Sequence, residues 1–136
     1  MTVLAAEITK PTKPRLVSLE AYFRAEEKAS VRHEYHAGKV IAMPGGTFNH
    51  DNLIAKTIAY LTEFVEKNDL DFFVNGSNTK IRIEDFDKIV YPDALVVAEK
   101  PIYFEGRKDC ITNPMIIVEV QSKSTAKYDR TEKFDE

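Results

Sequence analysis

The chain contains one cysteine, Cys110, so no disulfide can form within it. A lone cysteine fits a reducing compartment better than a secreted one, and no apolar run is long enough for a signal sequence or a membrane span. We therefore expect a cytoplasmic protein. The sequence also lacks an excess of basic residues, because 19 Lys and Arg stand against 22 Asp and Glu. A nucleic acid would have to be held by a local basic patch or by metal ions.

The 136 residues, with 43% apolar content, are enough for one core and too few for two domains. Residues 1–15 carry two Lys-Pro pairs and no apolar periodicity, which predicts a flexible N-terminal arm. Residues 16–136 are expected to form a single α/β domain. We find no internal repeat and no low-complexity tract.

Two helices and a hairpin are predicted in the first half of the chain. Ser18 can cap a helix that runs to about Lys28, and Ala37-Gly38 suits a tight turn between extended runs at 32–35 and 39–43. A long helix is predicted over 49–67, because apolar residues recur there at helical spacing, namely Leu53, Ile54, Ile58, Leu61 and Val65.

The second half is richer in extended runs. They cover 72–74, 79–83, 89–97 and 115–120, with a polar loop before the last and a short helix predicted over 125–136. This order of elements predicts a curved mixed β-sheet flanked by helices, preceded by an N-terminal helix and a β-hairpin.

Two acids stand at the ends of strand-forming runs, Asp93 in YPDALVV and Glu119 in IIVEVQ. Carboxylates among β-branched neighbours are costly to bury as ions unless a cation or hydrogen-bond donors satisfy them. The stretch between them is long enough for one strand, a loop and a return strand. Two interpretations remain open at this point: a shared magnesium site, or two solvated strand ends.

Several runs in the chain resemble the Uma-two family, a bacterial family of restriction-endonuclease-like proteins in the PD-(D/E)XK nuclease superfamily. They are RHEY (32–35), GKVIAMPGGT (38–47), NHDN (49–52), YPD (91–93), IVEVQSKST (117–125) and YDRTEKF (128–134). The resemblance runs in order from about Ser18 to the end of the chain. It implies a restriction-endonuclease-like fold that lacks its C-terminal strands.

The resemblance also implies roles for individual residues. Asp93 and Glu119 match the metal-binding acids, with Mg²⁺ as the cofactor and Mn²⁺ as a substitute, and Glu34 matches an auxiliary acid ligand. Gln121 stands where the core motif places a lysine. Lys133, in the following predicted helix, is therefore assigned the displaced catalytic role, so the catalytic set is Asp93, Glu119, Gln121 and Lys133.

Three further residues are candidates for binding substrate. His50 lies at the start of the long predicted helix, where it could meet a phosphate, although a cap or packing role is the alternative. Lys123 and Arg130 belong to a basic run after Glu119 that could face a polyanion. The alternative for that run is a solvated helix with internal salt bridges.

The leading functional hypothesis is a magnesium-dependent endonuclease that hydrolyses phosphodiester bonds in DNA. The alternative is a catalytically decayed relative that binds nucleic acid or associates with itself, which Gln121 favours. A homodimer formed through an unfinished sheet edge is a third expectation.

Overall fold

The computed structural model describes residues 15–121. Residues 1–14 and 122–136 lie outside that range, so the expected arm, apart from residue 15, and the expected helix over 125–136 lie outside the described residues.

The predicted first helix and hairpin are confirmed. Helix α2 spans Leu19–Glu26, and the Ser18 hydroxyl caps it by accepting the Ala21 N–H at 3.1 Å. Strands β1 (His33–His36) and β2 (Lys39–Ala42) pair antiparallel. The two residues between them, Ala37 and Gly38, have φ of 49° and 93°, as a tight hairpin turn requires.

The long helix, α3, spans Phe48–Lys67 and is capped by Thr47, whose hydroxyl accepts the His50 N–H at 3.1 Å. It contacts β3 (Phe72–Asn75) and β6 (Ala94–Ala98). None of its residues is fully buried. The predicted apolar stripe is half-buried at Ile54, Ile58, Leu61 and Val65, but Leu53 is 53% exposed and lies outside the packed face.

The strands form two sheets instead of the one that the sequence suggests. The larger is mixed, in the order β2-β1-β5-β4-β8-β7, with β4 and β8 parallel and the other pairs antiparallel. The smaller is antiparallel, in the order β3-β6-β9. The remaining elements are β4 (Lys80–Ile83), a 3-10 turn η1 (Glu84–Phe86), β5 (Lys88–Val90), β7 (Tyr103–Phe104), β8 (Arg107–Ile111) and β9 (Ile116–Val118).

Two strand predictions are corrected. The run predicted over 89–97 breaks at Tyr91-Pro92-Asp93, so that β5 joins the larger sheet and β6 the smaller. Pro92 has no N–H to give to a ladder, which explains a break at this place. The segment that we expected to be a polar loop contains β7 and β8. Residues 107–109 of β8 are not buried, so this part of the strand does not alternate apolar and polar residues as a half-buried strand would.

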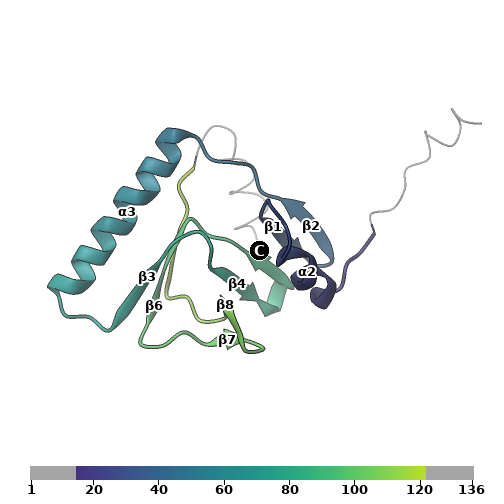
Figure 1. Ribbon diagram of the computed structural model, residues 1–136. Coiled ribbons are helices and arrows are strands. Elements are labelled where there is room, and N and C mark those ends of the chain that lie inside the picture. The colour runs from purple at the N-terminus through teal and green to yellow at the C-terminus, as the bar shows by residue number, and fades with distance from the viewer. Residues whose placement is uncertain (1–14, 122–136) are drawn as a thin grey trace, which may run out of the picture.

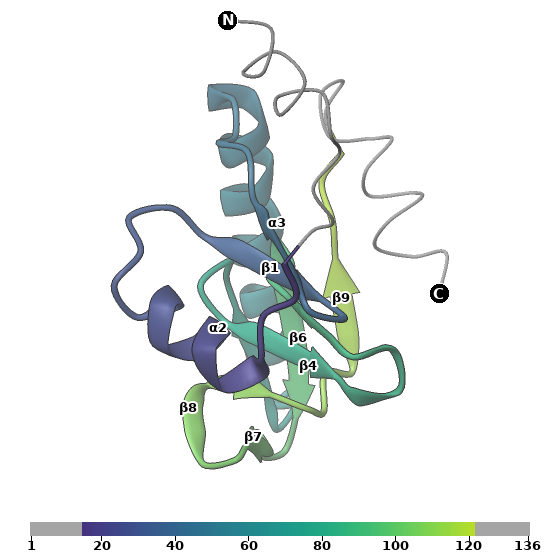
Figure 2. The ribbon, with the colours of Figure 1, turned by 90° about the vertical axis from the view of Figure 1, so that its right-hand side faces the viewer.

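The two sheets and two helices stack as layers, which Figure 1 shows in the order α3, smaller sheet, larger sheet and α2, and Figure 2 views from the α2 side. One core cluster lies where α2 covers the larger sheet and contains Tyr22, Phe23, Tyr35, Ile89, Phe104 and Cys110. The other lies between the sheets and contains Ile81, Val90, Leu95, Val97 and Ile111. The predicted architecture of a mixed sheet flanked by helices is confirmed. No helix within residues 15–121 has the length and apolar content needed to cross a membrane.

Candidate functional site

The register of the smaller sheet brings the two predicted acids to one end of neighbouring strands. Ala94 pairs with Val118 and Leu95 with Ile117, so that continuing the ladder by one position places Asp93 opposite Glu119. Residues opposed in an antiparallel pair point to the same face, with Cβ atoms about 4.5–5.5 Å apart. Strand alternation places Asp93 on the face of the buried Leu95, toward the larger sheet.

A hydrogen bond fixes Asp93 against the segment that carries Glu119. The Val120 N–H donates to Asp93 Oδ2 at 2.7 Å, although the β9 ladder has already ended at Val118. The Asp93 side chain is 15% exposed, and Glu119 is also partly buried. The acids therefore sit in a sheltered position that solvent still reaches.

His50 joins this arrangement from the first turn of α3. Its Nε2 lies 2.6 Å from the Val120 carbonyl oxygen and 3.5 Å from Asp93 Oδ2. Its Nδ1 lies 3.7 Å from Asp51 Oδ1. Because a carbonyl oxygen can only accept a hydrogen bond, Nε2 is the protonated ring nitrogen and donates a hydrogen bond to the Val120 carbonyl.

Glu34 is fully buried, at 0% exposure, and lies beside the connection that leads to Asp93. Its Oε2 accepts the Tyr91 N–H at 3.0 Å, and its Oε1 lies 3.3 Å from His36 Nε2. Lys88, 3% exposed, pairs with His36 in the β1–β5 ladder. Strand alternation places this polar group on the face of the larger sheet that is directed toward the smaller sheet. Asp93, on the smaller sheet, is directed toward the larger sheet, so the two groups lie on facing surfaces.

The chemistry of these residues fits a hard cation in part. Magnesium in proteins is held by oxygen ligands, commonly one or two carboxylates, and Asp93 with Glu119 can supply these. Glu34 is engaged by Tyr91 and His36. Among residues 15–121 no three or more His, Cys, Asp or Glu side chains are grouped as a metal site would group them. The ligand roles of Asp93, Glu119 and Glu34 stay predictions.

The other predicted site residues are placed only in part. Gln121 is exposed at the end of the described chain. Lys123, Arg130 and Lys133 lie outside the described residues. His50, a predicted substrate-binding residue, is engaged with main chain as described above, and its role toward substrate stays a prediction.

Two features of the site were missed from the sequence. The buried polar group of His36 and Lys88 beside Glu34 was one, and the alternation of Glu34 and His36 in HEYH was a usable signal for a polar strand face. The second missed feature is the role of the Val120 main chain, which no pattern of side chains in the sequence could have indicated.

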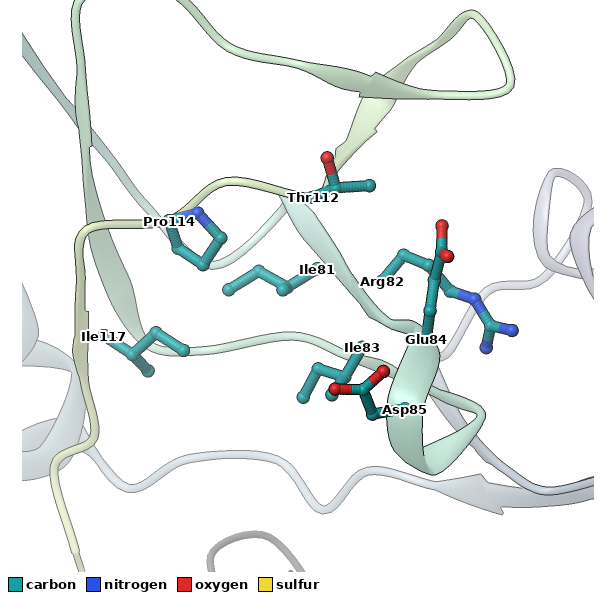
Figure 3. A pocket seen from close by; sticks show the side chains of 8 residues that line it. All are labelled: Ile81, Arg82, Ile83, Glu84, Asp85, Thr112, Pro114 and Ile117. Carbon is teal, nitrogen blue, oxygen red and sulfur yellow. The ribbon is translucent and has the colours of Figure 1, made fainter.

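A pocket of about 520 Å³ opens between the two sheets, along the same face of β9 as Glu119. Figure 3 shows Ile81 and Ile83 on one side of β4 and Ile117 across from them, with the Arg82 guanidinium directed away. Glu84 and Asp85 also line it. None of the predicted site residues does, so the pocket flanks the acid pair without containing it.

Cys110 is excluded as a nucleophile by its surroundings. Its side chain is 0% exposed, and burial raises the pKa of the thiol to about 12. A cysteine acts as a nucleophile through its thiolate, which is scarce near neutral pH at such a pKa.

Comparisons with known proteins place the chain in a family. Residues 19–136 match the family model "Uma2: Putative restriction endonuclease". Two proteins of Synechocystis sp. are similar: uncharacterized protein sll1609, 29% identical over 120 residues, and uncharacterized protein slr1290, 33% identical over 123 residues. These alignments cover 88% and 89% of this chain but 67% and 61% of the relatives.

A solved structure shares the fold. The crystal structure of a putative nuclease belonging to DUF820 from Anabaena variabilis superposes with a TM-score of 0.68 at 17% identity. It matches 86% of this chain, which spans 65% of that protein. The expected restriction-endonuclease-like fold is confirmed, and the chain belongs to the Uma2 family of putative restriction endonucleases.

Proposed function

We propose that this protein is a metal-dependent endonuclease that hydrolyses phosphodiester bonds in DNA, with Mg²⁺ as its cofactor and Mn²⁺ as a substitute. The observation that carries the proposal is the opposed placement of Asp93 and Glu119 at one end of β6 and β9, with Val120 bound to the Asp93 carboxylate. Membership of the Uma2 family supports the reaction class.

Asp93 and Glu119 hold the cation through carboxylate oxygens. When bound, the ion supplies a water of lowered pKa and neutralises charge that develops on the phosphate. His50 brings the N-terminus of α3 beside the acid pair, and the positive end of a helix favours an anionic phosphate there. Gln121 and Lys133 orient the attacking water, while Lys123 and Arg130 contact the DNA backbone.

Glu34 acts as the auxiliary acid. Its contact with the Tyr91 N–H ties it to the segment Tyr91-Pro92-Asp93, so it influences the Asp93 position even where it does not reach the ion.

The test compares cleavage of plasmid DNA by purified wild-type protein and its variants in Mg²⁺ or Mn²⁺. Asp93→Asn and Glu119→Gln keep the side-chain shape and remove the charge, and each should lower the rate at least about 100-fold. Asp71→Asn and Glu66→Gln are matched controls, because both side chains are exposed and Asp71, just before β3, bonds Glu99 beyond the far end of β6. Cleavage that survives Asp93→Asn would refute the proposed site.

The second candidate is a nuclease-fold protein that binds nucleic acid without cutting it. The exposed Gln121, at the position where the core motif has a lysine, favours it. Titration of labelled DNA by fluorescence anisotropy, in parallel with the cleavage assay, separates the two. Binding without cleavage in either metal would support this candidate over the first.

Self-association is proposed through β9. It is an edge strand of the smaller sheet within the described residues, and Met115, Ile116 and Ile117 are 45%, 45% and 39% exposed. An apolar edge with unpaired main-chain groups can pair with the same edge of a second copy. Sedimentation velocity should detect a dimer that Ile116→Lys weakens, and a monomer at all concentrations would contradict it.

A further inference from the structure

The main chain of Val120 is held on both sides by side chains that are distant in sequence. Its N–H donates to Asp93 Oδ2 at 2.7 Å, and its carbonyl accepts His50 Nε2 at 2.6 Å. Because β9 ends at Val118, these two contacts hold the chain just beyond the last residue of the strand. Glu119 lies between the end of the ladder and this double attachment.

His50 is itself held in a fixed orientation. Its main-chain N–H donates to the Thr47 hydroxyl, which caps α3, and its side chain is only 14% exposed. The preceding turn lies close to the ring: a Cβ built on Gly46 would lie 2.9 Å from His50 Nδ1, and 2.6 Å from Asp51 Oδ1. A Cβ on the neighbouring Gly45 would meet nothing within 4 Å. Gly46 therefore leaves the space that the ring occupies.

We propose that His50 is a positioning residue, which holds Val120 against Asp93 and thereby sets the separation of the Asp93 and Glu119 carboxylates. The inference rests on the proposed function, which makes these carboxylates the working groups of the site. It differs from a substrate-binding role, because Nε2 is engaged with the Val120 carbonyl and the other ring nitrogen, Nδ1, is buried. A segment beyond the end of its ladder frays unless other contacts hold it, and small displacements of catalytic groups are costly.

The experiment uses the full chain and three measurements: the Kd for Mn²⁺ by calorimetry, the DNA cleavage rate, and hydrogen exchange of the Val120 amide by NMR. His50→Ala should speed Val120 exchange about 10-fold or more and weaken Mn²⁺ binding about 10-fold to 100-fold. His50→Gln, whose amide can still donate, should restore part of both. Exchange of the Ile89 amide, in the core under α2, reports that the fold is intact.

The two glycines supply a matched pair that leaves the histidine in place. Gly46→Ala crowds the Asp51 carboxylate, which is 72% exposed and can turn into solvent, and the His50 ring, which is 14% exposed and must be displaced. It should therefore reproduce the His50→Ala result in all three measurements. Gly45→Ala adds the same methyl group to open space and should match wild type.

Unchanged Val120 exchange in His50→Ala would overturn the inference, as would faster exchange with unchanged Mn²⁺ affinity and rate. A higher KM for DNA with unchanged Mn²⁺ affinity and Val120 exchange would also overturn it and assign His50 to the substrate. A wild-type protein that neither binds Mn²⁺ nor cuts DNA refutes the proposed function, a result distinguishable from these.

Discussion

The half of the molecule under α2 and the half under α3 differ in how far their polar groups are enclosed. Under α2, the hydroxyls of Tyr22 and Tyr35 donate to main-chain carbonyls, and Glu26 accepts from the His33 N–H and the Tyr91 hydroxyl. Aromatic rings pack around them. This half resembles a closed core in which each named polar group has a protein partner.

The half under α3 is more open. The helix has no fully buried residue, and its Tyr60 and Phe64 are 67% and 49% exposed. At the sheet end, the Asp93 carboxylate and the His50 ring are each hydrogen-bonded to the main chain of Val120. The difference indicates that stability is concentrated under α2, whereas the acids lie where the structure can admit a ligand.

The largest expected effect comes from one substitution made in both halves. Phe23, 3% exposed, packs against Tyr22 and Phe104, so Phe23→Ala should cost about 3–5 kcal/mol of unfolding free energy. Phe64→Ala on α3 should cost about 1 kcal/mol or less, because the ring is already half in water. Urea denaturation of both variants measures this. Equal losses would show that the two halves are equally closed.

The next effect tests whether Glu34 belongs to the closed core. Glu34→Ala leaves the Tyr91 N–H without its carboxylate acceptor, which should cost about 1–3 kcal/mol. Glu20→Ala is the control, since the Glu20 side chain is 79% exposed and bonds only an exposed arginine in the same helix. If both variants unfold at the same urea concentration, the Glu34 contact does not stabilise the fold.

Local elements could be predicted well from the sequence, because their causes are local. Ser18 caps α2, Ala37-Gly38 turns the hairpin, and the apolar spacing of 49–67 gives α3. The failures have tertiary causes. Pro92 divides one extended run between two sheets, and Leu53 falls outside the packed face because α3 rests on a narrow sheet.

The site was predictable only at the level of its acids. Asp93 directly precedes one strand and Glu119 directly follows another, and the pairing of these two strands brings the acids opposite each other. The bond from His50 to Val120 joins residues 70 positions apart and ends on a main-chain atom. No residue type marks such a contact, since every residue has a carbonyl, and it emerges only when the helix end meets the strand end.

A smaller effect follows from the thiol in the closed half. The folded pKa of Cys110 is raised to about 12 by burial, whereas the unfolded thiol ionises near its ordinary value of 9.0. Above pH 9 the unfolded state therefore binds fewer protons than the folded state. The contribution of this thiol to the unfolding free energy is fully present below pH 9 and is lost as pH rises toward the folded pKa. The expected loss is about 1.4 kcal/mol per pH unit.

Urea denaturation at pH 8, 9 and 10 measures this slope. The slope reaches its full value only well above pH 9, so in Cys110→Ala the fall between pH 9 and 10 should be smaller by about 1 kcal/mol, even if the variant is less stable throughout. Parallel slopes for both proteins would show that the thiol ionises alike in the folded and unfolded states.

The smallest expected effect asks whether surface charges contribute to the contrast between the halves. Each helix carries one exposed ion pair at i, i+4 spacing: Arg24 with Glu20 at 2.9 Å in α2, and Lys67 with Glu63 at 3.0 Å in α3. Double-mutant cycles should give about 0.5 kcal/mol or less for each, and 1 M salt should reduce both, because solvent screens exposed charges. Equal and small couplings would assign the contrast to burial. A coupling above about 1 kcal/mol in α2 alone would mean that its stability also depends on surface charge.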